Sequence, residues 1–197
     1  MSRYLALRDR RLHGGVPARN GLSIVNADAS TSLSSVFGQI KGALGPHDKF
    51  SAMFILCHGF AGRNARARVS MDAGGEGLQL GAENVVHSNV ARWAAIAGKV
   101  DNIVVYSCAA GNTERGNEGT TADGRYLMGA LAIHTGATVY AADRIQWYST
   151  YNGLANGRFE FDEWEGQLWQ FPPNGNPPSV VAGAPVEFSD VMGGVAA

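Results

Sequence analysis

Four runs of apolar residues are spaced along the first three quarters of the chain. They cover residues 22–26, 53–58, 103–108 and 137–142. Continuous apolar runs of this length are typical of strands in a parallel sheet that is covered on both faces. Between them, apolar side chains recur at helical spacing in the segments 30–44, 90–97 and 126–134. This alternation predicts an α/β fold with a mainly parallel central sheet and helices on both of its faces.

Two further segments have the pattern of small β-hairpins. In residues 66–80, two short alternating stretches flank a glycine-rich turn. After residue 146, two Asn-Gly pairs, which favour tight turns, stand between aromatic residues. Five of the seven prolines follow residue 171. We therefore expect a single domain over 1–171 and an irregular Pro/Gly-rich tail over 172–197.

The composition restricts the classes of function. The 197 residues suffice for one well-packed domain, and the net charge of −1 gives no reason to expect binding to nucleic acid or to a membrane surface. The sequence shows no signal peptide and no run of about 20 apolar residues that would span a membrane. Both cysteines, Cys57 and Cys108, lie in apolar runs, which favours a reducing, cytoplasmic setting over a disulfide framework. Export without a cleaved signal and the oligomeric state are left open.

Two of the apolar runs end at residues that can do chemistry, His58 and Cys108. Ligands of parallel sheets bind just beyond the carboxyl ends of the strands, so both side chains are expected at one edge of the sheet. A neighbouring histidine helps to generate the cysteine thiolate, which is the nucleophilic form. In the alternative interpretation, the cysteine is simply buried and the histidine is a polar group at a strand end.

Gly59 directly follows the histidine. A glycine here allows the backbone to come close to a substrate oxygen. The N–H groups of Gly59 and Cys108 are therefore candidates for an oxyanion hole. A plain turn glycine is the alternative.

The sequence around these residues resembles the caspase-like cysteine peptidases of clan CD, and in pattern is most similar to the bacterial CHAT and caspase-like domains. The matching stretches are Phe-Ile-Leu-Cys-His-Gly at 54–59, the hairpin at 67–80, Leu-Gly-Ala-Glu-Asn-Val at 80–85, Ile-Val-Val-Tyr-Ser-Cys-Ala-Ala-Gly at 103–111, and residues 131–143. Caspases also carry their histidine about 50 residues before the cysteine. The resemblance covers roughly residues 20–150 and implies a caspase-like sandwich. It also implies a cysteine endopeptidase with His58 as catalytic histidine, Cys108 as nucleophile, a protein or peptide substrate and no cofactor.

The chain departs from the caspase pattern next to the cysteine. Caspases have Gln-Ala before it and a glycine two residues after it, whereas here Tyr106 and Ser107 precede it and the glycine is Gly111. Aspartate specificity is therefore not carried over. Asp143, at the end of the following strand, instead favours cleavage after Arg or Lys. Trp147 is a candidate wall of the substrate pocket.

Both assignments have alternatives. Asp143 is equally consistent with a turn at a strand end, and Trp147 with packing in the core. Three arginines that follow the histidine would instead favour an acidic substrate: Arg63, Arg66 and Arg68.

Other functions have less support. Residues 56–62 resemble the oxyanion strand of an α/β-hydrolase. That fold needs a glycine two residues before the nucleophile, where this chain has Tyr106, and a catalytic histidine late in the chain. The one histidine after Cys108 is His134, which lies in a helical pattern just before the next strand. The five histidines show no paired spacing of the kind that metal ligands have. The main alternative is a catalytically inactive caspase-like module that binds other proteins.

Overall fold

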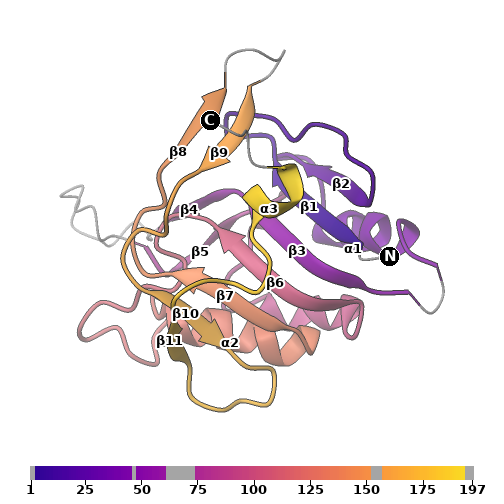
Figure 1. Ribbon diagram of the computed structural model, residues 1–197. Helices are drawn as coiled ribbons and strands as arrows, with labels where there is room; N and C mark the ends of the chain where they lie inside the picture. The colour runs from indigo at the N-terminus through magenta and orange to yellow at the C-terminus, as the bar shows by residue number, and fades with distance from the viewer. Residues whose placement is uncertain (1–2, 46–47, 61–73, 152–156, 194–197) are drawn as a thin grey trace.

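A seven-stranded sheet in the order β11-β10-β7-β6-β3-β1-β2 forms the centre of the computed structural model, which describes residues 3–45, 48–60, 74–151 and 157–193 (Figure 1). Five neighbouring strands are parallel: β2 (Leu22–Ala27), β1 (Tyr4–Asp9), β3 (Phe50–Leu56), β6 (Val100–Tyr106) and β7 (Thr138–Ala142). Strands β10 (Leu168–Phe171) and β11 (Ser179–Val181) continue the sheet in antiparallel pairing. The predicted α/β fold with a mainly parallel sheet is confirmed.

The structure contains one parallel strand, β1, that none of the four apolar runs predicted. It lies between β3 and β2, so that Tyr4 pairs with both Ala52 and Leu22. Its buried apolar stretch is only Leu5 to Leu7, and charged residues follow at once. The stretch is too short to be recognised as a buried run, although it becomes one of the inner strands of the sheet.

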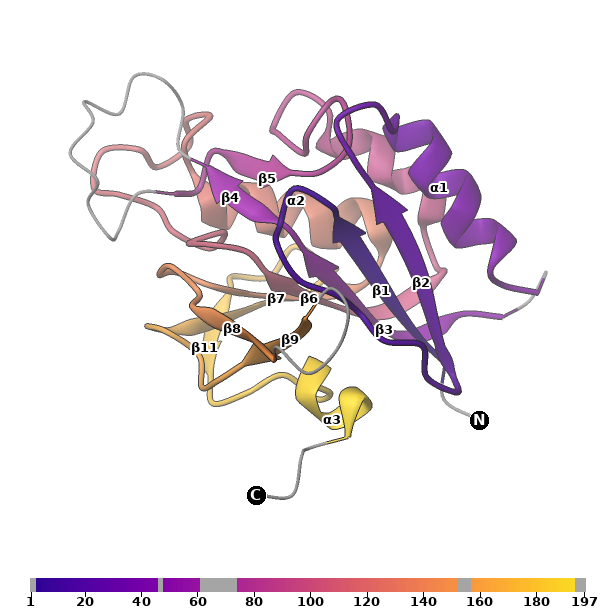
Figure 2. The same ribbon diagram turned by 90° about the horizontal axis from the view of Figure 1, so that it is seen from above.

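Three helices pack on one face of the sheet: α1 (Leu33–Gly42), the 3₁₀ helix η1 (Val90–Ile96) and α2 (Gly124–Thr135). Figure 2 shows α1 and α2 on the same side. Helix α2 ends where the sequence predicts, at Gly136 in the left-handed conformation with φ 69°, and the Asp123 side chain caps its N-terminus. The core on this face joins these helices to β3 and β6.

The opposite face is covered by the C-terminal part of the chain. Of the helices in the described part of the chain, only the short α3 (Phe188–Met192) packs there, beside β9 (Arg158–Phe161). Phe188 is buried against Phe54 and Tyr106, and its N–H donates a hydrogen bond of 3.0 Å to the Tyr106 hydroxyl. We expected helices on both faces of the sheet. On this second face, the described residues supply that helical cover through the short α3 alone.

The expectation of an irregular tail over 172–197 is wrong for two of its segments. Strand β11 extends the sheet, and α3 fills the second core. The prolines stand before β11 and between β11 and α3, where no ladder hydrogen bond is lost.

Two small hairpins stand apart from the sheet. Strand β4 (His58–Phe60) pairs with β5 (Gly77–Gln79), and β8 (Tyr148–Tyr151) pairs with β9. The second hairpin is where the sequence predicts it. For the first, the predicted strand at 67–71 lies outside the described residues, and the described partner of β5 is the segment that begins with His58. In the described part of the chain, no helix has the length and apolar character needed to cross a membrane.

Candidate functional site

The register of the sheet brings His58 and Cys108 to neighbouring strand ends. Strands β3 and β6 are adjacent and parallel, and Leu56 is paired with Tyr106. His58 and Cys108 therefore each lie two residues beyond a paired position, at the carboxyl edge where ligands of such sheets bind. His58 is exposed and Cys108 is half-buried. Within the described residues no hydrogen bond joins the imidazole to the sulfur, and catalytic contacts often tighten only when substrate is bound.

Gly59 is in direct contact with the backbone of the candidate nucleophile. A Cβ atom on Gly59 would overlap the carbonyl oxygen of Cys108 and crowd the Ser107 hydroxyl. Only glycine fits where β4 crosses the end of β6, so the requirement for glycine comes from the protein's own backbone. An oxyanion role for the N–H groups of Gly59 and Cys108 stays a prediction.

The turn that carries Cys108 is held in an unusual conformation. Ala109, the next residue, has φ 47°, which is uncommon for a residue with a side chain. The turn is fixed to the end of β7, because Ala109 donates to the Arg144 carbonyl at 2.7 Å and Gly111 donates to the Ala142 carbonyl at 2.9 Å. Strained turns of this kind are concentrated at active sites, where the surrounding structure holds them in place.

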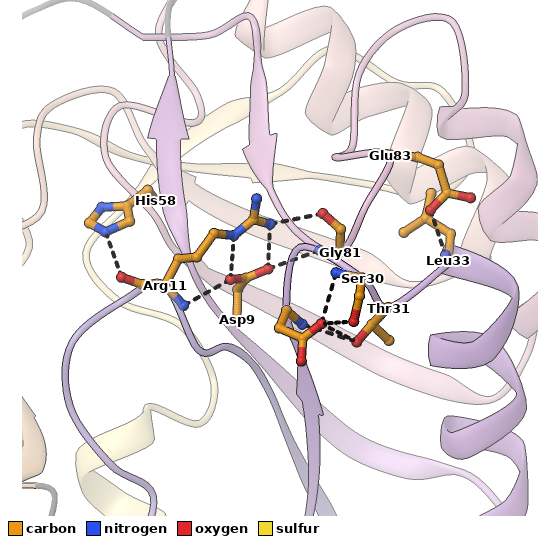
Figure 3. Close-up of polar contacts among 9 residues, drawn as sticks. Asp9, Arg11, Ser30, Thr31, Leu33, His58, Gly81 and Glu83 are labelled. Atoms are coloured by element: carbon orange, nitrogen blue, oxygen red, sulfur yellow. Dashed lines mark hydrogen bonds and ion pairs between the residues drawn. The ribbon is translucent and has the colours of Figure 1, made fainter.

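His58 is oriented by a backbone carbonyl from the loop after β1. Its Nε2 lies 3.3 Å from the carbonyl oxygen of Arg11 (Figure 3). A carbonyl only accepts hydrogen bonds, so Nε2 carries the proton, and in the neutral ring Nδ1 is the acceptor. The contact therefore selects the tautomer of the ring and limits its rotation.

Arg11 is itself held by a buried carboxylate. Asp9, whose side chain has no solvent exposure, accepts from Nε and Nη2 of Arg11 at 2.8 and 2.7 Å. It also accepts from the N–H groups of Arg11 and Gly81 at 3.0 and 2.9 Å, while Arg11 donates to the Gly81 carbonyl at 2.8 Å (Figure 3). Such bidentate pairs fix geometry as well as charge. The Asp9–Arg11 pair therefore ties β1, the end of β5 and the His58 contact into one unit.

Burial by itself raises the pKa of Asp9. The hydrogen bonds from Arg11 and Gly81 act in the opposite direction and outweigh it, so that the net pKa lies below the ordinary value. Sequence reasoning missed Asp9 and Arg11. The signal was present, because Asp9 is a carboxylate at the end of an apolar stretch, but its partner Gly81 lies 72 residues away.

Cys57 and Cys108 lie in different environments. Cys57 is 1% exposed, and burial raises the pKa of its thiol to about 12. The Cys108 sulfur lies 4.0 Å from the Gln146 carbonyl and is partly accessible. Since the thiolate is the reactive form, the two thiols should differ in reactivity.

We expect limited iodoacetamide at neutral pH to label Cys108 first and Cys57 only after unfolding. Peptide mass mapping over time measures both rates, and the Cys57→Ala variant should be labelled at the wild-type rate. Faster labelling of Cys57 in the folded protein would contradict this assignment.

Asp143 lies at the end of β7, as the sequence predicts, but already has partners there. One carboxylate oxygen accepts from the Gln167 N–H at 2.9 Å, and the other accepts from the Trp169 indole at 3.2 Å. These contacts anchor the start of β10, and the sequence analysis did not predict this strand. Each oxygen keeps a further acceptor position, so the contacts leave room for a substrate cation.

Trp147 is 56% exposed and follows Gln146, whose carbonyl faces the Cys108 sulfur. This exposure argues against the alternative that its ring packs in the core. The candidates for acidic specificity, Arg63, Arg66 and Arg68, lie outside the described residues. In the part of the chain that the structure describes, no three His, Cys, Asp or Glu side chains are grouped so that they could hold a metal ion.

No protein-family model, curated protein or solved structure matched this chain in the comparisons.

Proposed function

We propose that the protein is a cysteine endopeptidase of the caspase-like type with a His58–Cys108 dyad. The observation that carries this proposal is the pairing of β3 with β6, which brings the two residues to adjacent strand ends. The strained turn after Cys108 and the hydrogen bond that orients His58 support it. A protein-binding module would need neither feature.

In the proposed reaction, the Cys108 thiolate attacks the carbonyl carbon of the scissile peptide bond. The developing oxyanion accepts hydrogen bonds from the N–H groups of Gly59 and Cys108. His58 donates its proton to the leaving amine, and the acyl-enzyme remains on the sulfur. His58 then takes a proton from water, which attacks the thioester and releases the acid. The dyad returns to its starting protonation state without a cofactor.

The test of this function is a cleavage profile on a mixed peptide library. Wild-type protein and the Cys57→Ala variant should cleave, and the Cys108→Ala variant should not. A peptide carrying a thiol-directed electrophile should modify Cys108 in the wild type. Absence of both cleavage and modification would favour the alternative, an inactive caspase-like module that binds proteins.

Preference for Arg or Lys before the scissile bond is the second part of the proposal, with Asp143 as its determinant. We expect the isosteric Asp143→Asn variant to lose about tenfold in kcat/KM on Arg and Lys substrates, which corresponds to about 1.4 kcal/mol. Alkylation of Cys108 should be unchanged. Trp169→Phe removes one of the partners of Asp143 and should keep the preference. An unchanged preference in Asp143→Asn would leave Asp143 with an anchoring role only.

The remaining expectations stay predictions: a protein or peptide as partner, no binding to nucleic acid, and a cytoplasmic location.

A further inference from the structure

A hollow with two arginines lies at the edge of the sheet, beside the candidate site. It has a volume of about 540 Å³ and is lined by Arg8, Arg10, Val16, Ile24 and Asn26. Arg8 is the penultimate residue of β1 and is paired with Asn26 of β2 on one side. On the other side it is paired with Leu56 of β3, two residues before His58. We call this feature the Arg8–Arg10 hollow.

The described part of the chain places no carboxylate in an ion pair with the arginines of this hollow. Among the described residues, neither Arg8 nor Arg10 forms an ion pair, and the Nε–H of Arg8 is buried without a hydrogen-bond acceptor. Within the described residues, the Arg8 side chain donates a single hydrogen bond, a long contact of 3.5 Å to the Leu12 carbonyl. Its guanidinium lies 5.6 Å from the centre of the Phe159 ring. Asp9, between the two arginines in sequence, is occupied by Arg11. A half-buried guanidinium with an unused donor is stabilised when an anion binds.

Electrostatics agree with this geometry. Burial lowers the pKa of Arg8, and the neighbouring charge of Arg10 lowers it further. Asp9 and Tyr148 oppose these two effects only in part, so the net pKa of Arg8 lies below its ordinary value, and a negative group in the hollow would favour the cation.

The hollow is also close to the dyad. Burial raises the pKa of Tyr148; the charge of Cys108 adds to this rise, whereas that of Arg8 opposes it. The Tyr148 hydroxyl thus lies within electrostatic range of both residues. Neighbouring strands are about 4.8 Å apart, so β1 is about 10 Å from β6, and an extended peptide covers that distance in about three residues.

We propose that the Arg8–Arg10 hollow binds the carboxylate of an Asp or Glu side chain a few residues away from the scissile bond of a peptide held at the dyad. The two guanidinium groups and the Asn26 amide supply the donors, and Val16 and Ile24 contact the side-chain methylenes. The proposal rests on the proposed peptidase function, because it places the rest of the peptide at His58 and Cys108. A free inorganic anion has the same chemistry, so the experiment must separate the two sources.

The experiment measures binding without cleavage, on the Cys108→Ala protein. Pairs of fluorescent peptides that are identical except for Glu or Gln at one position are titrated by anisotropy. That position is moved through the four residues on either side of a fixed central residue. Inorganic phosphate is titrated separately by calorimetry. At one position the Glu peptide should bind at least about tenfold more tightly than its Gln partner. Arg10→Gln and Arg8→Met, the second of which keeps a long unbranched side chain at this position, should each remove this difference.

Arg19→Gln is the matched control, because Arg19 is an exposed arginine from the same loop outside the hollow. It should leave the Glu preference unchanged. Equal binding of Glu and Gln peptides at every position would overturn the proposal, and phosphate binding that depends on Arg8 would then mark a site for a free anion only. If the wild type cleaves no peptide while an Arg8-dependent Glu preference persists, the peptidase proposal fails and the carboxylate site stands.

Discussion

Replacement of Cys108 by alanine is expected to reduce peptide cleavage by at least about a thousandfold while leaving the fold intact. The alanine variant retains the backbone N–H groups but has no nucleophile. His58→Ala should cause a loss of similar size, because the leaving amine then lacks its proton donor. Since the two groups act as a unit, the double variant should be no slower than the slower single variant.

The measurement is kcat/KM on the best library substrate, with circular dichroism and thermal unfolding as checks on folding. His87→Ala is a suitable control, because His87 contacts the Asp123 carbonyl at 3.2 Å and stacks on Tyr126 rather than facing the dyad. It should keep the activity. Substantial cleavage by either Cys108→Ala or His58→Ala would remove the dyad from the mechanism.

Asp9→Asn is expected to have the largest effect among residues outside the dyad. It breaks a buried, bidentate ion pair, and such losses cost about 3 kcal/mol. For a chain of this size that is a fall in Tm of about 6–12 °C. The loop with the Arg11 carbonyl should also loosen, which is expected to lower kcat by about tenfold to a hundredfold through misplacement of His58. Asp9 is in this sense a positioning residue.

The pH dependence separates the two effects of Asp9. Its pKa is depressed in the folded state, so its contribution to stability is fully present above the ordinary value of about 3.9. That contribution is lost as the pH falls through the lower native value. The difference in unfolding free energy between wild type and Asp9→Asn should therefore be constant from about pH 5 to 8 and shrink below about pH 4.

Two further readouts complete the test. The loss in Asp9→Asn should fall on kcat and leave KM nearly unchanged, because the variant misplaces His58 rather than the groups that bind substrate. Asp48→Asn removes an exposed pair with Arg3, in which both side chains are 48% exposed, and should cost less than about 1 kcal/mol with an unchanged kcat. A stability loss in Asp9→Asn with a wild-type kcat would reduce Asp9 to a purely structural role.

The parts of the fold that could be predicted from the sequence are those in which one short segment carries the whole signal. The apolar runs at 53–58 and 103–108 correspond to β3 and β6, and the end of α2 at Gly136 followed from a glycine after a helical pattern. Strand β1 gave no such signal, because its buried apolar run is only three residues long. The 3₁₀ geometry of η1 also went unseen, since the apolar spacing of seven residues fits either type of helix.

In the candidate site, too, the features that could be predicted are those signalled by a single segment. His58 and Cys108 could be placed together because both end buried runs of one parallel sheet. The partners of Asp143 could not be predicted, since Gln167 and Trp169 approach it only after the chain reverses into β10. The pairing of Asp9 with Gly81 likewise depends on tertiary structure. Sequence therefore indicated the reactive groups but not the contacts that orient them.

The placement of α3 on Tyr106 has a consequence for biosynthesis. Phe188 closes the aromatic cluster on the second face of the sheet, and its contact with Tyr106 spans 82 residues. While a ribosome is still making the segment between them, Phe54 and Tyr106 remain without this cover. During that interval the nascent chain displays a large aromatic surface of the kind that chaperones recognise. The end of β6, with Cys108 two residues beyond Tyr106, therefore acquires this cover only after residue 188 has been made.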